Sequence, residues 1–390
     1  MFSLHIDTAR TWRGGQNQVL LTVDGLRGIG QRAVLVAHPD GELRSRAAEG
    51  LELVPIAART EMDLTAAWRL ARVVKRLGPD ILHAHDAHAT AMASLALSLS
   101  GNTVMGGTGA DSKTDRRLSP ALVVSRRVDF HLRQNSFSRW KHRQVDCFIA
   151  ASEAIRKMLI ADRVEATRVV TVHEGIDLEH VLHAPAVNVH EAFWLPHDAP
   201  VVGNVAALVP HKGQRHLIEA AHLVVQEIPD ARFVILGEGE LRQQLERQIR
   251  EYHLEKHVLL PGFRTDVIGC MKSFDLFVMS SVTEGLGTSL LDAMACSRAI
   301  VATRAGGIPE IVEDGQTGVL VNPRDHRAMA REIVRLLKND ALRQQLGTAG
   351  LARVTERFTV DHMIAGTAAV YERVAGRPHA ADTARQPARE

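Results

Sequence analysis

Two acidic residues and two glycines between positions 280 and 321 form the part of this sequence best suited to chemistry. The segment reads SSVTEGLGTSLLDAMACSRAIVATRAGGIPEIVEDGQTGVLV, and its pattern predicts a strand, a polar turn and a helix. Gly285 and Gly287 leave the first helical amides bare, which together with the helix dipole makes an anion site suited to phosphate. Glu284 precedes this site, and Asp292 lies two turns further on, on roughly the same face. The two carboxylates could bind hydroxyls on either side of a diphosphate, whereas an ordinary N-capped helix is the simpler alternative.

Two other turns carry residues that suit an anionic ligand. Residues 201–221, VVGNVAALVPHKGQRHLIEAA, predict a strand, a loop and a helix with Lys212 at the helix start. A lysine there can reach a diphosphate, although a surface lysine beside a turn glycine also fits. In residues 12–21, WRGGQNQVLL, Gly14 and Gly15 permit close approach of a ligand, and a tight turn is the alternative.

The elements that must position these residues are short apolar runs alternating with longer amphipathic ones. MFSLHID, RAVLVAHP, LELVPI and DILHAH predict buried strands, and six further runs, from PVVGNVAAL to TGVLVNP, follow a polar stretch. Such repetition makes parallel sheets covered by helices on both sides. The sequence therefore predicts two α/β domains, at 1–185 and 198–358, with a last helix at 359–376 and a disordered tail at 377–390. Residues 101–120, rich in Gly, Ser and Asp, predict a long mobile loop.

Composition excludes several classes of protein. Lys plus Arg number 47 and Asp plus Glu 45, a net charge of +2, so bulk charge does not attract nucleic acid. No apolar run reaches the roughly 18 residues of a membrane-spanning helix, and the first residues lack the basic segment of a signal peptide. Cys147, Cys270 and Cys296 are widely separated, which favours reduced thiols. We therefore expect a cytoplasmic protein.

The segment from 280 to 321 resembles the E-x7-E signature of retaining glycosyltransferases of the family-4 type. These enzymes have the GT-B architecture, in which two Rossmann-like parallel-sheet domains face a central cleft. The resemblance runs from the Gly14–Gly15 loop to Phe358 and is densest over 200–325, where VPHKG, EGLG, LLDAMA and AGGIPEIVEDGQTG fall in family order and spacing. It implies a metal-independent enzyme without a cofactor that moves a sugar from a nucleotide diphosphate sugar to a hydroxyl acceptor, in cell-envelope glycan or glycolipid assembly.

The resemblance also assigns the donor-binding residues to the second domain. Glu284 would contact sugar hydroxyls, the backbone amides after it would hold sugar and phosphate, and Asp292, where the family usually has Glu, would bind the ribose diol. Lys212 would hold the diphosphate, with Ala207 in the place of a second cation that the family usually has. Arg304 or Arg127 are the alternatives for that cation. The expected donor-binding set is Gly15, Lys212, Arg264, Glu284, Leu286, Gly287, Thr288, Ser289 and Asp292.

The first domain would hold a glycan or lipid-linked acceptor, and the last helix would cross back to it. The expected acceptor-side residues are Gly14, His85, Asp86 and Arg127. Arg127 aligns with a histidine that in much of the family lies near the anomeric carbon. An arginine there can hold phosphate or an anionic acceptor, but it cannot act as a base. The expected catalytic residues are therefore Glu284, Lys212 and Arg127.

Residues 83–88, HAHDAH, nearly match the HxHxDH metal site of metallo-β-lactamase-like hydrolases. His83 and His85 alternate along a strand end and so share a face, but Asp86 stands one residue too early for that motif. That fold also needs a double β-sandwich, whereas this chain predicts parallel α/β units. We therefore expect no metal here and a strand end that is packed or that lines the acceptor cleft.

The stretch from 120 to 146 is basic and contains aromatic residues. Six cations between Arg126 and Arg143 are interleaved with Phe130, Phe137 and Trp140. Such a surface could contact an anionic membrane where a lipid acceptor lies, and a solvated helix face is the alternative.

Two other functions fit the same motifs. A nucleotide-sugar epimerase or hydrolase would use the same donor site without an acceptor. A non-catalytic nucleotide-sugar-binding protein is conceivable because Ala207 and Arg127 replace residues that the family usually has. The fold alone does not decide among these functions.

Overall fold

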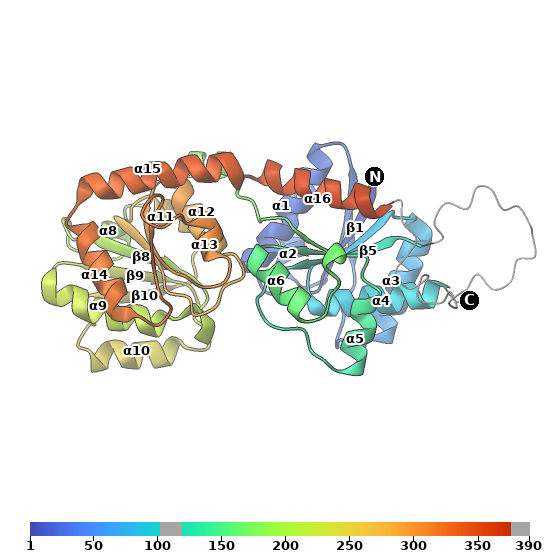
Figure 1. Cartoon of the computed structure of the whole chain (residues 1–390), viewed down its shortest axis with the longest axis horizontal. Coiled ribbons are helices and arrows are strands. Elements are labelled where there is room, and N and C mark those ends of the chain that lie inside the picture. Colours follow the sequence, from blue (N-terminus) through green and yellow to red (C-terminus); the bar gives the residue numbers. More distant parts are fainter. Residues whose placement is uncertain (102–118, 376–390) are drawn as a thin grey trace, which may run out of the picture. The chain divides into compact units, whose positions relative to one another are not determined.

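The computed structural model describes residues 1–101 and 119–375, and it divides into two compact units. The first unit holds Met1–His173 and the chain from Val360 onward, and the second holds Glu174–Thr359 (Figure 1). The first unit thus ends at His173, earlier in the sequence than the domain end expected at residue 185. Apart from its ends, the loop expected at 101–120 lies outside the described residues, as does the tail expected at 377–390.

The first unit is built on a seven-stranded parallel sheet with the order β3-β2-β1-β4-β5-β6-β7. The strands are β1 Phe2–Asp7, β2 Arg32–Ala37, β3 Leu53–Pro55, β4 Ile81–Ala84, β5 Ala121–Arg126, β6 Cys147–Ala150 and β7 Val169–Thr171. The helices are α1 Gly14–Gly28, α2 Glu42–Ser45, α3 Leu64–Leu77, α4 Ala87–Gly101, α5 Ser136–Arg143, α6 Glu153–Ala161 and α16 Val360–Ala375, with a 3-10 turn at Ala166–Arg168. The strand order reverses between β1 and β4, and ligands of such sheets bind at this point.

The C-terminal helix α16 packs against α1 of the first unit (Figure 1). Gly25 makes this contact close, because a Cβ atom there would lie 2.4 Å from Cγ1 of Ile364. Apolar residues of α16, among them Met363 and Val370, join a core with Ile81 of β4 and Val123 of β5. The helix therefore covers one face of this sheet near the reversal of strand order.

The second unit has a six-stranded parallel sheet with the order β10-β9-β8-β11-β12-β13. Its strands are β8 Val201–Val205, β9 Arg232–Leu236, β10 Val258–Gly262, β11 Leu276–Met279, β12 Ala299–Thr303 and β13 Val319–Val321. Its helices are α7 Leu178–His183, α8 Val189–Ala192, α9 Gln214–Glu227, α10 Arg242–Glu251, α11 Val267–Met271, α12 Thr288–Ala295, α13 Ile308–Ile311, α14 His326–Leu337 and α15 Asp340–Arg357, with a 3-10 turn at Pro210–Lys212. Here the order reverses between β8 and β11.

Both sheets confirm the predicted fold class of two Rossmann-like parallel-sheet domains. The reason is visible in the inner strands β1, β4, β11 and β12, which are almost wholly buried because helices cover both faces. Within the described residues, we find no helix with the length and apolar character needed to cross a bilayer.

Candidate active site

Lys212 and Glu284 meet where the strand order of the second unit reverses. Lys212 ends the turn after β8, and Glu284 lies in the turn after β11. The Lys212 Nζ and Glu284 Oε2 atoms are 2.6 Å apart, and Ser281 Oγ donates a hydrogen bond to the same carboxylate oxygen at 2.9 Å. Glu284 is only 8% exposed, so this charge-assisted contact is largely shielded from water. The structure thus places a cation and a carboxylate at one point of the sheet edge.

Two glycines let the surrounding loops approach closely enough for this pair to form. Gly213 has φ +66°, and a Cβ atom there would lie 2.2 Å from the Ser280 carbonyl oxygen. Gly306 has φ +51°, and a Cβ atom there would lie 1.6 Å from the Glu284 carbonyl oxygen. Ser280 Oγ also donates to the Lys212 carbonyl oxygen at 3.0 Å. Backbone contact therefore fixes the loops that carry the pair.

The turn after Glu284 leads into α12, whose first amides are open to an anion. Gly287 precedes the helix with φ +97°, and among the described residues no side chain caps it. Leu286 is buried, whereas Thr288 and Ser289 at the helix start are half-buried. Uncapped amides and the helix dipole favour a negative charge at this point, shortly after Glu284 in the sequence.

Asp292 lies on α12 one turn beyond Thr288 and therefore on the same face of the helix. Its carboxyl is half-buried, and burial raises its pKa to about 7. A carboxyl with this pKa changes charge near neutral pH, and it can accept or donate hydrogen bonds to a ligand diol.

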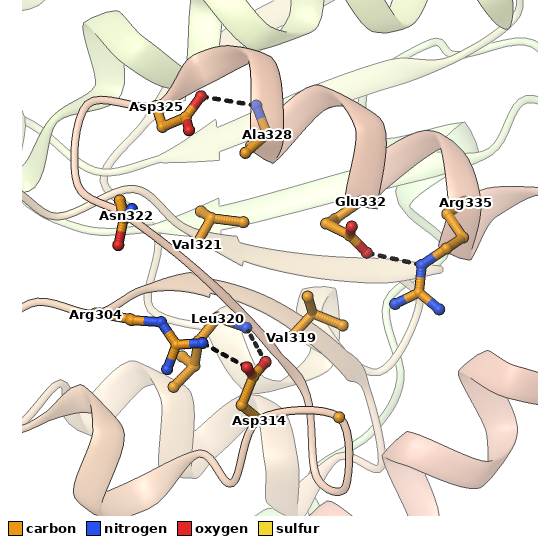
Figure 2. Close-up of a pocket in the computed structure, with 11 residues that line it drawn as sticks. Arg304, Asp314, Val319, Leu320, Val321, Asn322, Asp325, Ala328, Glu332 and Arg335 are labelled. Carbon is orange, nitrogen blue, oxygen red and sulfur yellow. Dashed lines mark hydrogen bonds and ion pairs between the residues drawn. The ribbon is translucent and has the colours of Figure 1, made fainter.

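Two arginines considered for the donor are engaged elsewhere in the second unit. Arg264 Nη2 lies 2.5 Å from Asp266 Oδ2, and its guanidinium lies 5.3 Å from the centre of the Phe193 ring. Arg304 Nη2 lies 2.5 Å from Asp314 Oδ2, beside β13 and the start of α14 (Figure 2). The pocket that Arg304 lines does not include Lys212. Each arginine thus has an acidic partner, and the roles of Arg304 and Arg264 at the donor stay predictions.

In the first unit, Gly15, His85 and Arg127 come together at the β1–β4 reversal. A Cβ atom at Gly15 would lie 4.0 Å from Cδ of Arg127, and Arg127 Nη1 lies 3.0 Å from His85 Nδ1. Gly14 begins α1 beside them. Asp86 accepts a hydrogen bond from the Thr8 amide at 2.6 Å and so joins the loop after β1 to the end of β4. The expected acceptor-side residues thus lie at one sheet edge.

Sequence reasoning missed two residues at this edge, His5 and Asp7. In β1, His5 lies directly across from His83, and its Nδ1 is 2.9 Å from His85 Nε2. Burial and the Asp86 carboxylate raise the pKa of Asp7 to about 6. The sequence could have indicated both residues, because β1 and β4 are neighbours in a doubly wound sheet and successive side chains in each strand point to opposite faces.

One ring nitrogen from each of His5, His83 and His85 lies within 4.8 Å of the other two. However, each ring nitrogen already has a hydrogen-bond partner in the protein. Burial lowers the pKa of all three imidazoles, that of His5 to about 3. A metal ion would have to displace these partners next to the Arg127 charge, and the absence of a metal from this site stays a prediction.

The Asp292→Asn variant should become more stable relative to the parent protein as the pH rises. The carboxyl has its ordinary pKa of 3.8 in the unfolded chain and about 7 in the folded protein. Between these values the folded protein keeps a proton that the unfolded chain has lost, so this group lowers stability as the pH rises. In urea unfolding, the variant and the parent protein should have similar free energies of unfolding at pH 4. At pH 8 that of the variant should be higher by about 2 kcal/mol, which is less than the full pKa shift implies because solvent screens a half-buried carboxyl.

The exposed Asp230→Asn variant serves as the matched control and should show no such trend. If the difference between Asp292→Asn and the parent protein does not change with pH, the raised pKa is wrong.

Two family models match the two halves of the chain. Residues 12–180 match the model described as Glycosyltransferase Family 4, and residues 188–353 match the model described as Glycosyl transferases group 1. Over 314 residues the chain is 26% identical to N-acetyl-alpha-D-glucosaminyl L-malate synthase of Bacillus anthracis, covering 79% of this chain and 78% of that enzyme. Over 212 residues it is 28% identical to poly(ribitol-phosphate) alpha-N-acetylglucosaminyltransferase of Staphylococcus aureus, covering 52% of this chain and 43% of that enzyme. The chain thus spans less than half of the staphylococcal enzyme.

Solved structures show the same fold over nearly the whole chain. Anabaena Alr3699/HepE in complex with UDP-glucose has a TM-score of 0.80 at 20% identity and covers 96% of this chain and all of its own. A glycosyltransferase from Rickettsia africae has a TM-score of 0.78 at 16% identity, with 97% of this chain and 99% of its own covered. Since glycosyltransferase models match both halves and this fold is shared, the chain belongs to the GT-B glycosyltransferases of the family-4, group 1 type.

Proposed function

We propose that this chain transfers a sugar from a nucleotide diphosphate sugar to a hydroxyl acceptor, with retention of anomeric configuration and without a metal. The Lys212–Glu284 pair beside the open start of α12 carries this proposal. A cation and helix amides suit a diphosphate, and a shielded carboxylate suits the hydroxyls of the attached sugar. The complexes of HepE with UDP and UDP-glucose support a nucleotide sugar as the donor.

In the reaction that we propose, these groups lower the activation barrier mainly by stabilising charge. As the bond between the anomeric carbon and the phosphate oxygen breaks, negative charge grows on the diphosphate, which Lys212 and the α12 amides stabilise. The acceptor oxygen forms its new bond on the same face, and its proton passes to the departing phosphate oxygen. Because the cation and amides take up the leaving group's charge, no metal is needed in this scheme.

The acceptor side of the proposal rests on the first unit. Gly14, Gly15 and Arg127 lie at its sheet edge, where ligands of doubly wound sheets bind. The S. aureus and B. anthracis relatives are named for transfer to poly(ribitol-phosphate) and L-malate, which supports a polar or anionic acceptor. We infer a glycan or lipid-linked acceptor of the cell envelope and a cytoplasmic enzyme.

The proposed function is tested first with donors and then with acceptors. A bound donor raises apparent stability, so thermal shifts with UDP-, GDP- and ADP-sugars identify the nucleotide. With that donor, we expect turnover only when an acceptor is present, unchanged by EDTA, and an NMR coupling constant at the new linkage that matches the donor's anomeric configuration. Rapid release of free sugar or an epimerised donor without any acceptor would favour an epimerase or hydrolase. Donor binding with no turnover on any acceptor would favour a binding protein.

Variants of the ion pair should separate diphosphate binding from sugar transfer. Lys212→Ala should cost about 2–4 kcal/mol of transition-state stabilisation, the scale of one preorganised charge, and should also weaken binding of the free nucleoside diphosphate. Glu284→Gln frees Lys212 from its carboxylate partner. This variant should therefore bind the free diphosphate at least as tightly as the parent while losing turnover.

Calorimetry with the free nucleoside diphosphate and steady-state kinetics measure the two effects. Asp292→Asn is the comparison variant, because its expected partner is the ribose and it should weaken diphosphate binding. A Glu284→Gln variant that loses affinity as much as Lys212→Ala would overturn this division of the donor.

The basic stretch of the first unit is less uniform than the sequence indicated. Lys141 is only 3% exposed and forms an ion pair with Glu61, so it does not contribute to an outer basic surface. This ion pair joins α5 to the loop just before α3. On α3 itself, the Trp68 side chain is 52% exposed. Arg139 and Arg143 remain exposed on α5. We propose that exposed cations and Trp68 on α3 and α5 give peripheral contact with an anionic membrane.

Vesicle co-sedimentation tests this contact. An Arg139→Ala/Arg143→Ala variant should lower partition onto anionic vesicles roughly 30-fold, because each cation near the surface is worth about 1 kcal/mol. Binding should also fall at high salt. An Arg247→Ala/Arg250→Ala variant, which removes two exposed arginines from α10 in the second unit, is the matched control. No sedimentation of the parent protein with anionic vesicles would leave a solvated face and favour an acceptor in solution.

A further inference from the structure

A buried row of polar side chains starts at Arg127 and crosses the face of β4 and β1. Arg127 Nη1 lies 3.0 Å from His85 Nδ1, and His85 Nε2 lies 2.9 Å from His5 Nδ1. His5 Nε2 in turn lies 3.0 Å from Ser3 Oγ. The rings of His5 and His85 lie nearly in one plane, with 14° between their planes and their centres 5.2 Å apart, as an in-plane N–H···N hydrogen bond requires. His5, His85 and Ser3 are all buried.

The row continues to the C-terminal helix. Ser3 hydrogen-bonds Tyr371 of α16, whose hydroxyl lies 2.6 Å from His83 Nδ1. His83 Nε2 lies 2.8 Å from Ser125 Oγ on β5. The groups therefore form one connected series of hydrogen bonds that starts at Arg127 and reaches Tyr371 of the C-terminal helix α16.

The guanidinium of Arg127 fixes the direction of the first three hydrogen bonds. A guanidinium has donors and no acceptor, so His85 Nδ1 must accept from it. A neutral imidazole has one N–H, which places the proton of His85 on Nε2, where it donates to His5 Nδ1. The same reasoning places the proton of His5 on Nε2, where it donates to Ser3. Burial lowers the pKa of both imidazoles, which keeps them neutral.

We propose that His85, oriented by His5, is a positioning residue that holds the Arg127 guanidinium in place for the substrate. This inference rests on the proposed role of Arg127 at the acceptor-side edge. A long arginine side chain loses considerable rotamer freedom when it is held. A buried neutral acceptor that is itself hydrogen-bonded to a second histidine removes that freedom before substrate binds. The neutral imidazole adds no negative charge of its own beside the guanidinium, whose charge also acts on the Asp7 carboxyl.

A matched pair of variants at His85 separates positioning from packing. The amide oxygen of Asn reaches the position of Nδ1 and can still accept from Arg127. The amide of Gln reaches the position of Nε2, so it preserves the contact with His5 and loses the one with Arg127. We expect kcat of His85→Asn to exceed that of His85→Gln by about tenfold, the scale of one hydrogen bond to a charged group, with similar donor KM and melting temperature.

Arg127→Ala and the double variant Arg127→Ala/His85→Gln complete a thermodynamic cycle. The double variant should be no slower than Arg127→Ala, because His85 acts through Arg127. Full activity of Arg127→Ala would refute the proposed role of Arg127 itself. If Arg127→Ala loses activity but the two His85 variants are equally active, only the positioning role of His85 is overturned.

A measurement on the unmodified protein does not depend on activity or on folding of the variants. Nitrogen-15 NMR of histidine-labelled protein reports which ring nitrogen carries the proton. We expect His5 and His85 to be neutral with the proton on Nε2 from pH 6 to 8, and a proton on Nδ1 of His85 would overturn the proposal. Addition of Zn²⁺ should leave these signals unchanged, and their displacement by the ion would show a metal site in place of the hydrogen-bonded row.

Discussion

The contact between Lys212 and Glu284 requires two loops from separate strands to touch along their backbones. Opposite charges at 2.6 Å attract strongly only where water is largely absent, and Glu284 is 8% exposed. That burial is costly unless the partner is held in place. Gly213 and Gly306 hold the partners in place because they let the two loops touch. Any larger residue at these positions would collide with the carbonyl oxygens of Ser280 and Glu284. The order of strands puts β8 beside β11, and the glycines then close the remaining distance.

Much of the fold could be predicted because its signals are local and repeated. Apolar runs of strand length alternating with amphipathic helices leave few options other than parallel sheets, and both sheets follow this pattern. The candidate donor residues were equally accessible, because Glu284 and Asp292 lie within one strand–turn–helix segment. Periodicity alone placed His83 and His85 on one face. Such inferences need only neighbours in sequence.

What the sequence could not provide depends on pairings between distant segments. The engagement of Lys141 with Glu61 and of Arg304 with Asp314 turns two apparently available cations into structural groups. Nothing in the spacing of the residues indicates such partners. His5 is an intermediate case, since its place opposite His83 follows once the strand order of a doubly wound sheet is assumed. The family resemblance assigned the last helix to the first domain, but the contact of Tyr371 with His83 could not be predicted, because it depends on how α16 packs on the sheet.

The two units use electrostatics in different ways, and this difference follows from burial. The second unit holds formal charges at its sheet edge, where a diphosphate can replace part of the lost hydration. In the first unit, Arg127 donates to His85, an imidazole whose pKa burial lowers, and its charge also acts on the Asp7 carboxyl. A carboxylate in the place of His85 would hold the guanidinium more strongly but would neutralise it. A neutral histidine can position the same group without neutralising it, which suits the anionic acceptor that we propose.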